Sequence, residues 1–238
     1  MKLLYIIYQI LVSPILLVIT ILTALFTIIG CWLGNGHFWG YYPGKIWSIL
    51  FCAILLIPVR VVRNKNVHRK TSYVFVANHQ GAFDIFLLYG FLGRNFKWMM
   101  KSGIKKIPFV GFACKMSKQI FVGRNENTVK TYNLARKTLA GGTSMVVFPE
   151  GSRTYDGKMI PFKKGAFVLA DELQLPIIPI TINGVFKVMP RTKDWHFANW
   201  SPLRVTIHQP IYPVDKGMRN IVTITRQSFD SVQSALEI

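Results

Sequence analysis

Residues 73–92 read YVFVANHQGAFDIFLLYGFL, a short apolar run that leads through a polar turn into a longer apolar segment. Residues 73–77 are mostly β-branched or aromatic, which is typical of a buried strand, and residues 84–92 are expected to form a helix. Gly81 makes the turn between them easy, because glycine adopts backbone conformations that other residues avoid. The stretch therefore predicts a strand, a tight turn and a helix in direct succession.

Strand-like and helix-like segments continue to alternate along the rest of the chain. Further strands are expected at residues 96–100, 119–122, 144–148, 177–182 and 204–208, and further helices at residues 128–140, 166–173 and 220–236. Alternation of this kind predicts an α/β fold, in which helices flank a single, mostly parallel sheet of buried strands.

The N-terminal region has a different composition, since no Asp, Glu, Lys or Arg occurs between Lys2 and Lys45. Residues 3–33 are almost entirely apolar and would be roughly 45 Å long as one helix, against about 30 Å for a hydrocarbon core. Such a helix either tilts or breaks at Pro14 or Gly30. The run is too long for a signal peptide and no small-residue cleavage site follows it, so we expect a hydrophobic helical membrane anchor that is retained.

A second uncharged run, residues 46–59, would be about 20 Å long as a helix, which is short for a membrane span and typical of an interfacial or re-entrant segment. Basic residues follow it directly at Arg60, Arg63, Lys65, Arg69 and Lys70. By the positive-inside tendency they place the following domain on the cytoplasmic side of the membrane. We therefore predict a membrane-embedded helical region over residues 1–60 and a catalytic domain over residues 61–238. A helical hairpin in one leaflet and a true span both fit this pattern.

The charge of the chain points to an anionic partner. It has 29 basic and 10 acidic residues, a formal net charge of +19, which is far more than solubility requires. Nucleic acid, anionic lipid and a phosphorylated substrate are the candidate partners, and anionic lipid is the natural one for a membrane-anchored chain. The three cysteines show neither metal-ligand spacing nor a disulfide framework, so no metal site is expected.

The first acidic residue of the chain is Asp84, five positions after His79. On one continuous helix the two would point about 140° apart, so contact requires His79 in the turn and Asp84 on the first helical turn. The carboxylate would then hold one imidazole nitrogen and stabilise the imidazolium, while the other nitrogen removes a proton from a hydroxyl. The alternative is a histidine that caps the helix beside a carboxylate with a structural role. The spacing alone does not distinguish this structural pair from a catalytic one.

Residues 147–154 read VFPEGSRT and end an expected buried strand. Ligands of α/β sheets bind beyond the carboxyl ends of strands, where His79 is also expected. Gly151 lets the backbone approach a ligand closely, and Arg153 can grip a phosphate with two hydrogen bonds. A surface turn with an internal Glu150–Arg153 ion pair is the alternative. Lys101 and Arg124 are further basic residues at the ends of expected strands.

Together these segments resemble the glycerolipid acyltransferases, and most of all the 1-acylglycerol-3-phosphate (lysophosphatidic acid) acyltransferases. His79 and Asp84 resemble the family's His-x4-Asp motif, in which His is the general base and Asp orients it. Lys101 and Arg124 lie in a segment similar to a second block, whose Lys and Arg bind glycerol phosphate. Residues 148–153 are similar to the third block, and residues 175–180 to an apolar fourth block near the acyl site.

The resemblance implies transfer of a fatty acyl group from a thioester to the free hydroxyl of 1-acylglycerol 3-phosphate, giving phosphatidic acid in phospholipid biosynthesis. The thioester, on coenzyme A or acyl carrier protein, would be a co-substrate, with no cofactor and no metal. The partners would be the phospholipid bilayer, a lysophospholipid acceptor and the acyl thioester, without nucleic acid. The residues implied to bind substrate are Lys101, Arg124, Glu150, Gly151, Ser152 and Arg153.

Three points stay open. Ser152 stands where the third block usually has Thr. No Glu-Leu follows Lys101 and Gly123 stands where an acid is common, so glycerol 3-phosphate or another lysophospholipid is an alternative acceptor. Residues 107–113 suit either an acyl-chain groove or the core. A membrane-anchored, non-catalytic binder of anionic lipid or nucleic acid would explain the charge, but it leaves the acidic and basic motif residues unexplained.

Overall fold

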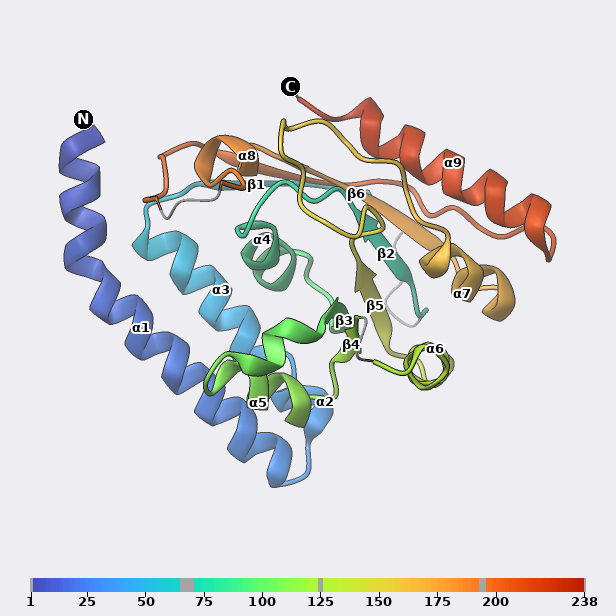
Figure 1. The fold of residues 1–238 in the computed structure, drawn as a ribbon, viewed down its shortest axis with the longest axis horizontal. Helices are drawn as coiled ribbons and strands as arrows, with labels where there is room; N and C mark the ends of the chain where they lie inside the picture. Colours follow the sequence, from blue (N-terminus) through green and yellow to red (C-terminus); the bar gives the residue numbers. More distant parts are fainter. Residues whose placement is uncertain (1, 65–70, 124–125, 193–195, 238) are drawn as a thin grey trace.

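The computed structural model describes residues 2–64, 71–123, 126–192 and 196–237. Its centre is a seven-stranded sheet with the strand order β1-β7-β6-β2-β5-β3-β4 (Figure 1). The strands are β1 Val59–Arg63, β2 Val74–Ala77, β3 Phe96–Lys101, β4 Ile120–Val122, β5 Ser144–Val147, β6 Ile177–Asn183 and β7 Leu203–Ile207. Only the β6–β7 pairing of this sheet is antiparallel, so the predicted α/β fold with a mostly parallel sheet is confirmed.

Helices cover both faces of the sheet (Figure 1). They are α1 Lys2–Trp32, α2 Gly36–Trp39, α3 Tyr42–Ile54, α4 Asp84–Phe91, the 3-10 helix η1 Ser102–Lys106, α5 Val110–Met116, α6 Thr128–Ala140, α7 Gly165–Leu173, α8 Val185–Val188 and α9 Met218–Ser234. Phe75 of β2 packs in the layer with α3 and α4, whereas its neighbours Val74 and Val76 pack in the layer with α6, α7 and α9. Both faces are buried because a parallel sheet is covered on each side by its crossover helices.

Each strand and helix expected in the α/β region is present, with bounds within two residues of those predicted. The sequence analysis missed β1, where it expected only a basic junction. Residues 59–63 instead form an edge strand that pairs in parallel with β7. Arg60 and Arg63 are exposed on it, so basic side chains are compatible with an edge strand and also discourage pairing with other chains.

Helix α1 is continuous over 31 residues and breaks at neither Pro14 nor Gly30. Proline cannot donate a hydrogen bond to the carbonyl of Ile10, but the hydroxyl of Ser13 donates to that oxygen at 2.9 Å instead. Gly30 allows close packing, since an added Cβ would lie 2.2 Å from the Trp39 ring. Among the described helices, α1 alone is long and apolar enough to cross a membrane, judged by length and composition.

Polar contacts bind α1 to the rest of the molecule along much of its length. The amide of Gln9 exchanges two hydrogen bonds of 2.9 Å with the backbone of Ala198. The Tyr8 hydroxyl donates to the Ile54 carbonyl at the end of α3, and the Trp47 indole of α3 donates to the Thr20 hydroxyl. Helix α3 in turn shares a core with α4. The N-terminal helices therefore pack directly against the α/β layers, and the division at residue 60 stays a prediction.

Gly184 ends β6 and sets the direction of the chain into α8, so we expect Gly184→Ala to destabilise the fold. Its φ is +88°, and an added Cβ would lie 2.5 Å from the Pro202 carbonyl oxygen. The expected loss is about 1–3 kcal/mol of unfolding free energy, measured as a lower thermal midpoint in detergent. Gly165→Ala is the control, because nothing lies within 4 Å of its added Cβ. Equal midpoints for the two variants would contradict this account.

Candidate active site

Two polar turns meet at the carboxyl edge of the sheet because β2 and β5 are parallel neighbours. Val76 of β2 is opposite Val147 of β5, and His79 and Glu150 each follow three residues later. The backbone N–H of His79 donates to Oε1 of Glu150 at 2.7 Å, so the two turns are in direct contact. The predicted juxtaposition of the His79 motif and the Glu150 motif is therefore present.

The imidazole of His79 is held by a buried carboxylate. Its Nδ1 lies 2.6 Å from Oδ2 of Asp84, and the Gly81 backbone N–H donates to the same oxygen at 2.9 Å. Asp84 is fully buried at the first position of α4, where the helix dipole favours a negative charge. The His79 side chain is 18% exposed. Its other nitrogen, Nε2, makes no hydrogen bond with the described residues and is available to a substrate.

An aromatic stack fixes the plane of the imidazole. The Phe148 ring lies parallel to the His79 ring, with centroids 3.9 Å apart and an interplanar angle of 8°. The Trp98 ring of β3 also stacks with Phe148, with centroids 5.6 Å apart. Because ring rotation would break this packing, the stack and Asp84 together define one orientation of the imidazole.

The backbone of the catalytic turn is tied to neighbouring segments. The His79 carbonyl accepts the Thr154 N–H at 2.9 Å. The buried side chain of Asn78 makes two hydrogen bonds to the backbone of Ile182 in β6, at 2.9 and 2.7 Å. Gly81 packs so closely that an added Cβ would lie 2.5 Å from the Met189 carbonyl. The turn that carries His79 is thus fixed from both sides.

Glu150 has a role that the sequence analysis did not foresee. Its second oxygen accepts the Ile160 N–H at 2.9 Å, so each carboxylate oxygen already holds one backbone N–H. The side chain is 2% exposed, and burial raises the pKa of Glu150 to about 7. No Glu150–Arg153 ion pair forms in the described structure. Although Glu150 was predicted to bind substrate, this geometry favours a residue that positions His79.

The residues after Glu150 form the cationic side of the site. Gly151 has a φ of +75°, a backbone conformation that residues other than glycine seldom adopt. The flexible side chain of Lys163 lies beside it, with Nζ 2.6 Å from the position of an added Cβ. Ser152 and Arg153 are half-buried. Within the described ranges the Arg153 guanidinium has no carboxylate partner. It therefore remains available to an anionic ligand.

Lys163 and Arg191 are basic residues of this region that the sequence analysis missed. Arg191 donates to the Arg153 carbonyl at 3.2 Å, and its guanidinium lies 4.0 Å from the centroid of the Tyr155 ring. It follows α8, which is packed under the catalytic turn. No motif pointed to Arg191, because its contact joins residues 38 positions apart.

Of the two other basic residues predicted to bind substrate, Lys101 and Arg124, the structure describes only Lys101. Lys101 is exposed at the carboxyl end of β3, the neighbour of β5, and so lies on the same edge as His79. Arg124 lies outside the described residues. Among the residues that are described, no group of three His, Cys, Asp or Glu side chains could hold a metal ion.

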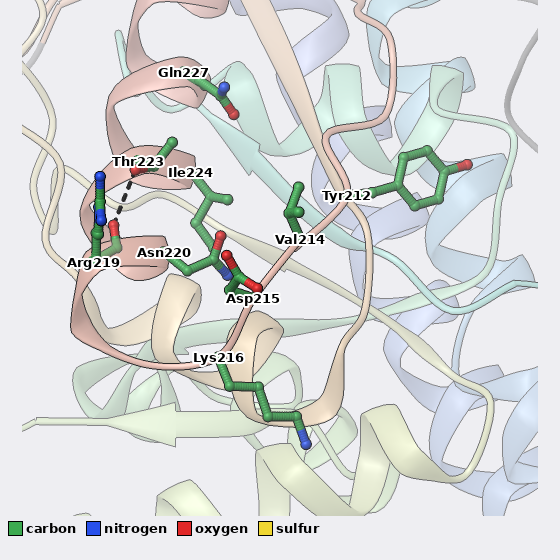
Figure 2. A pocket seen from close by; sticks show the side chains of 9 residues that line it. All are labelled: Tyr212, Val214, Asp215, Lys216, Arg219, Asn220, Thr223, Ile224 and Gln227. Atoms are coloured by element: carbon green, nitrogen blue, oxygen red, sulfur yellow. Dashed lines mark hydrogen bonds between the residues drawn. The ribbon is translucent and has the colours of Figure 1, made fainter.

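Two hollows were found away from His79. The larger, about 650 Å³, lies between α9 and the segment before it, and Figure 2 shows polar side chains such as Lys216 and Arg219 around it. The smaller, about 90 Å³ and largely apolar, lies where α1, α3 and α5 meet and includes Val110 and Ala113. Residues 107–113 are thus neither wholly core nor an evident groove beside the base, because Phe109 and Phe112 are exposed.

The comparisons with known proteins place this chain in a family. Residues 58–183, more than half of the chain, match the model of the Acyltransferase family, so the chain belongs to it and the predicted relationship is confirmed. A solved structure, the 1-acyl-sn-glycerophosphate acyltransferase PlsC from Thermotoga maritima, superposes with a TM-score of 0.79 over 98% of this chain and 93% of that one. At 23% identity that likeness concerns the fold.

Named relatives agree with this placement. A chloroplastic 1-acyl-sn-glycerol-3-phosphate acyltransferase of Brassica napus is 40% identical over 60% of this chain and 41% of its own length. The mouse 1-acyl-sn-glycerol-3-phosphate acyltransferase alpha is 30% identical over 68% of each chain. An uncharacterized acyltransferase of Schizosaccharomyces pombe is 31% identical over 82% of this chain and 71% of its own. The chain thus spans about two fifths of the plant relative.

We expect Glu150→Gln to change the pH dependence of stability. The pKa of Glu150 rises from its ordinary 4.5 to about 7 on folding, so the folded state holds this proton more tightly than the unfolded chain. The contribution of the Glu150 proton to stability is complete below about pH 4.5 and is lost as the pH rises through about 7. The thermal midpoint of the parent should therefore fall across this window relative to that of the variant.

Below about pH 4.5, where the parent keeps this contribution in full, Glu150→Gln should be less stable by about 1–3 kcal/mol, because the amide nitrogen cannot accept a backbone N–H. Glu172→Gln, at an exposed carboxylate of α7, is the matched control for the loss of one acid. Parallel midpoint curves for the parent and Glu150→Gln would show that Glu150 does not titrate as described.

Proposed function

We propose that the chain is an O-acyltransferase that moves a fatty acyl group from a thioester to the free hydroxyl of 1-acylglycerol 3-phosphate, forming phosphatidic acid in phospholipid biosynthesis. The observation that carries this proposal is the 2.6 Å contact between His79 and the buried Asp84, with Nε2 left available. Membership of the Acyltransferase family and the names of the relatives support the reaction and the acceptor.

In the proposed reaction, the acceptor hydroxyl approaches Nε2 of His79 and attacks the carbonyl carbon of the thioester. His79 takes the hydroxyl proton as the new C–O bond forms, and the buried Asp84 stabilises the resulting imidazolium. The tetrahedral intermediate then collapses, the C–S bond breaks, and the departing thiolate takes the proton from His79. No acyl-enzyme intermediate is needed, since the substrate alcohol replaces the serine of a hydrolase.

The cationic residues at the carboxyl edge would bind the acceptor phosphate. Arg153 is available for two parallel hydrogen bonds to it, Lys101 lies on the same edge, and Arg124 retains this role as a prediction. The acceptor hydroxyl would be held near His79 by these contacts, so orientation supplies much of the rate. Glycerol 3-phosphate and other lysophospholipids carry a phosphate as well and are the alternative acceptors.

The donor in this proposal is a thioester of coenzyme A or acyl carrier protein, and neither a metal nor another cofactor takes part. A non-catalytic binder of anionic lipid or nucleic acid would need the charge of +19 but not a buried carboxylate behind the imidazole. Family membership also argues against that alternative.

The N-terminal helices would hold the enzyme at the cytoplasmic face of the membrane without crossing it. Most apolar side chains of α1 are exposed, whereas Gln9, Ala24, Thr27 and Gly30 form its buried face. Because that face packs on other parts of the domain, as at Ala198, a span across the bilayer would draw polar backbone into hydrocarbon. Insertion into one leaflet avoids this cost, and the basic residues after α3 favour the cytoplasmic side.

We expect His79→Ala to lower the rate of acyl transfer roughly 100- to 10,000-fold, because the general base is lost. The assay follows product formation from acyl-CoA and 1-acylglycerol 3-phosphate, with the thermal midpoint measured in parallel. His37→Ala, at an exposed histidine of α2, should retain the parental rate. Full activity in His79→Ala would refute the proposed role of the imidazole.

We expect Arg153→Ala to raise KM for 1-acylglycerol 3-phosphate roughly 10- to 100-fold, as the loss of a charge-assisted hydrogen bond would. Uncharged 1-acylglycerol should be used no less well by the variant than by the parent. Arg136→Ala, at an exposed arginine of α6 that pairs with Glu172, is the control. If Arg153→Ala impairs the charged and uncharged acceptors equally, the residue serves the fold and does not bind phosphate.

A further inference from the structure

An exposed apolar turn follows β3 and η1 directly. Ile107 and Phe109 are each 49% exposed, and Phe112 is 53% exposed. These three residues, named here the 107–112 patch, lie within six positions of one another. Three large apolar side chains exposed together on a short turn indicate an interaction surface more than chance exposure.

The backbone is strained at the centre of this patch. Phe109 has φ +59° and ψ −53°, and the Val110 N–H donates to the Pro108 carbonyl at 2.6 Å. This is the rarer, strained form of γ-turn, which residues other than glycine seldom adopt. Gly111, two residues further on, packs so closely on η1 that an added Cβ would lie 2.4 Å from the Lys105 carbonyl oxygen. The fold thus holds an aromatic residue in an unfavourable conformation with its ring half exposed.

The patch continues the apolar surface of α1. Helix α5 packs beside α1 (Figure 1), with Val110 and Ala113 directed towards Ala24 and Thr27 of α1 at the apolar pocket between them. Phe112, from another face of α5, remains exposed. The exposed side chains of α1 are themselves overwhelmingly apolar. The two surfaces therefore lie on neighbouring elements.

Basic residues border the patch. Lys101 and Lys106 are exposed, and the charge of Lys105 is paired with Glu126. Apolar side chains beside exposed ammonium groups match an anionic bilayer surface, where rings enter the acyl boundary and amines meet phosphate. A protein partner would have to share this position with the lipid that surrounds α1.

We propose that Ile107, Phe109 and Phe112 insert into an anionic lipid surface as a second membrane contact beside α1. This rests on the proposed function, since a membrane-borne acceptor must reach His79. The short helix η1 connects the patch to Lys101 at the carboxyl edge of the sheet. With α1 and the patch both in the interface, that edge is held towards the bilayer, and rotation of the domain about α1 is prevented.

Insertion is tested directly with a tryptophan placed at the patch. Phe109→Trp and Tyr212→Trp each add one indole to the full chain. The control, Tyr212, is 56% exposed next to the bridge between Ile211 and Ile177, at the amino edge of β6 and away from His79. In vesicles of phosphatidylcholine and phosphatidylglycerol, brominated acyl chains should quench the added emission of Phe109→Trp but not that of Tyr212→Trp. Equal or absent quenching for both would overturn the proposal.

The consequence for catalysis is tested with Phe109→Ala combined with Phe112→Ala. Transfer to acceptor in anionic vesicles should fall tenfold or more, whereas transfer to acceptor in detergent micelles and the thermal midpoint should match the parent. Tyr212→Ala with Val214→Ala, which removes exposed apolar groups elsewhere, should leave both activities unchanged. A similar loss in vesicles and micelles would make the patch structural, and no loss in vesicles would also refute it.

The quenching result does not depend on the acyl-transfer reaction, so the proposed function and the proposed lipid contact can be refuted independently. A parent protein that transfers no acyl group even in micelles would contradict the proposed function, while quenching still decides insertion. If the patch variants abolish a dimer and the quenching is absent, the surface binds a second copy of this chain and the lipid contact is wrong.

Discussion

The Glu150 carboxylate and the parallel pairing of β2 with β5 hold the site together. Each oxygen of that carboxylate accepts one backbone N–H, from His79 and from Ile160. Buried N–H groups without partners would be costly, so the two turns are linked as firmly as the sheet beneath them. The remaining contacts of the site, such as the stacking of Phe148 on His79, require that the turns first lie side by side.

The acidic side chains of this site are buried, whereas its cationic side chains remain accessible to a ligand. Asp84 and Glu150 are shielded from solvent behind the turn, where they hold the imidazole and its backbone and would not repel the proposed anionic substrate. Arg153 and Lys101 lie further out, where a phosphate can reach them. This separation explains how a chain with few acidic residues places two of them beside its base. The positive charge on the outside would attract the substrate, and the carboxylates inside would stabilise the imidazolium.

The N-terminal helices would connect the proposed membrane binding to the geometry of the site. Helix α3 packs on α4, which carries Asp84 at its first position. Helix α1 contacts α3, α5 and the backbone near Ala198. A membrane anchor joined only by a flexible linker would leave the domain free to turn. Helix α1 is part of the same packed structure as the sheet, so in the proposed anchoring its position in a bilayer would also set the direction of the sheet edge.

The sequence by itself determined the succession of strands and helices from β2 onwards along the chain, the apolar N-terminal helix and the turn in which His79 and Asp84 can meet. These features are local: a strand-turn-helix succession leaves a pair five residues apart little freedom. The role of Glu150, the presence of Arg191 and the docking of Gln9 were decided only by the tertiary structure. Their contacts join residues 71, 38 and 189 positions apart. Such contacts depend on strand order and register, which apolar periodicity does not specify.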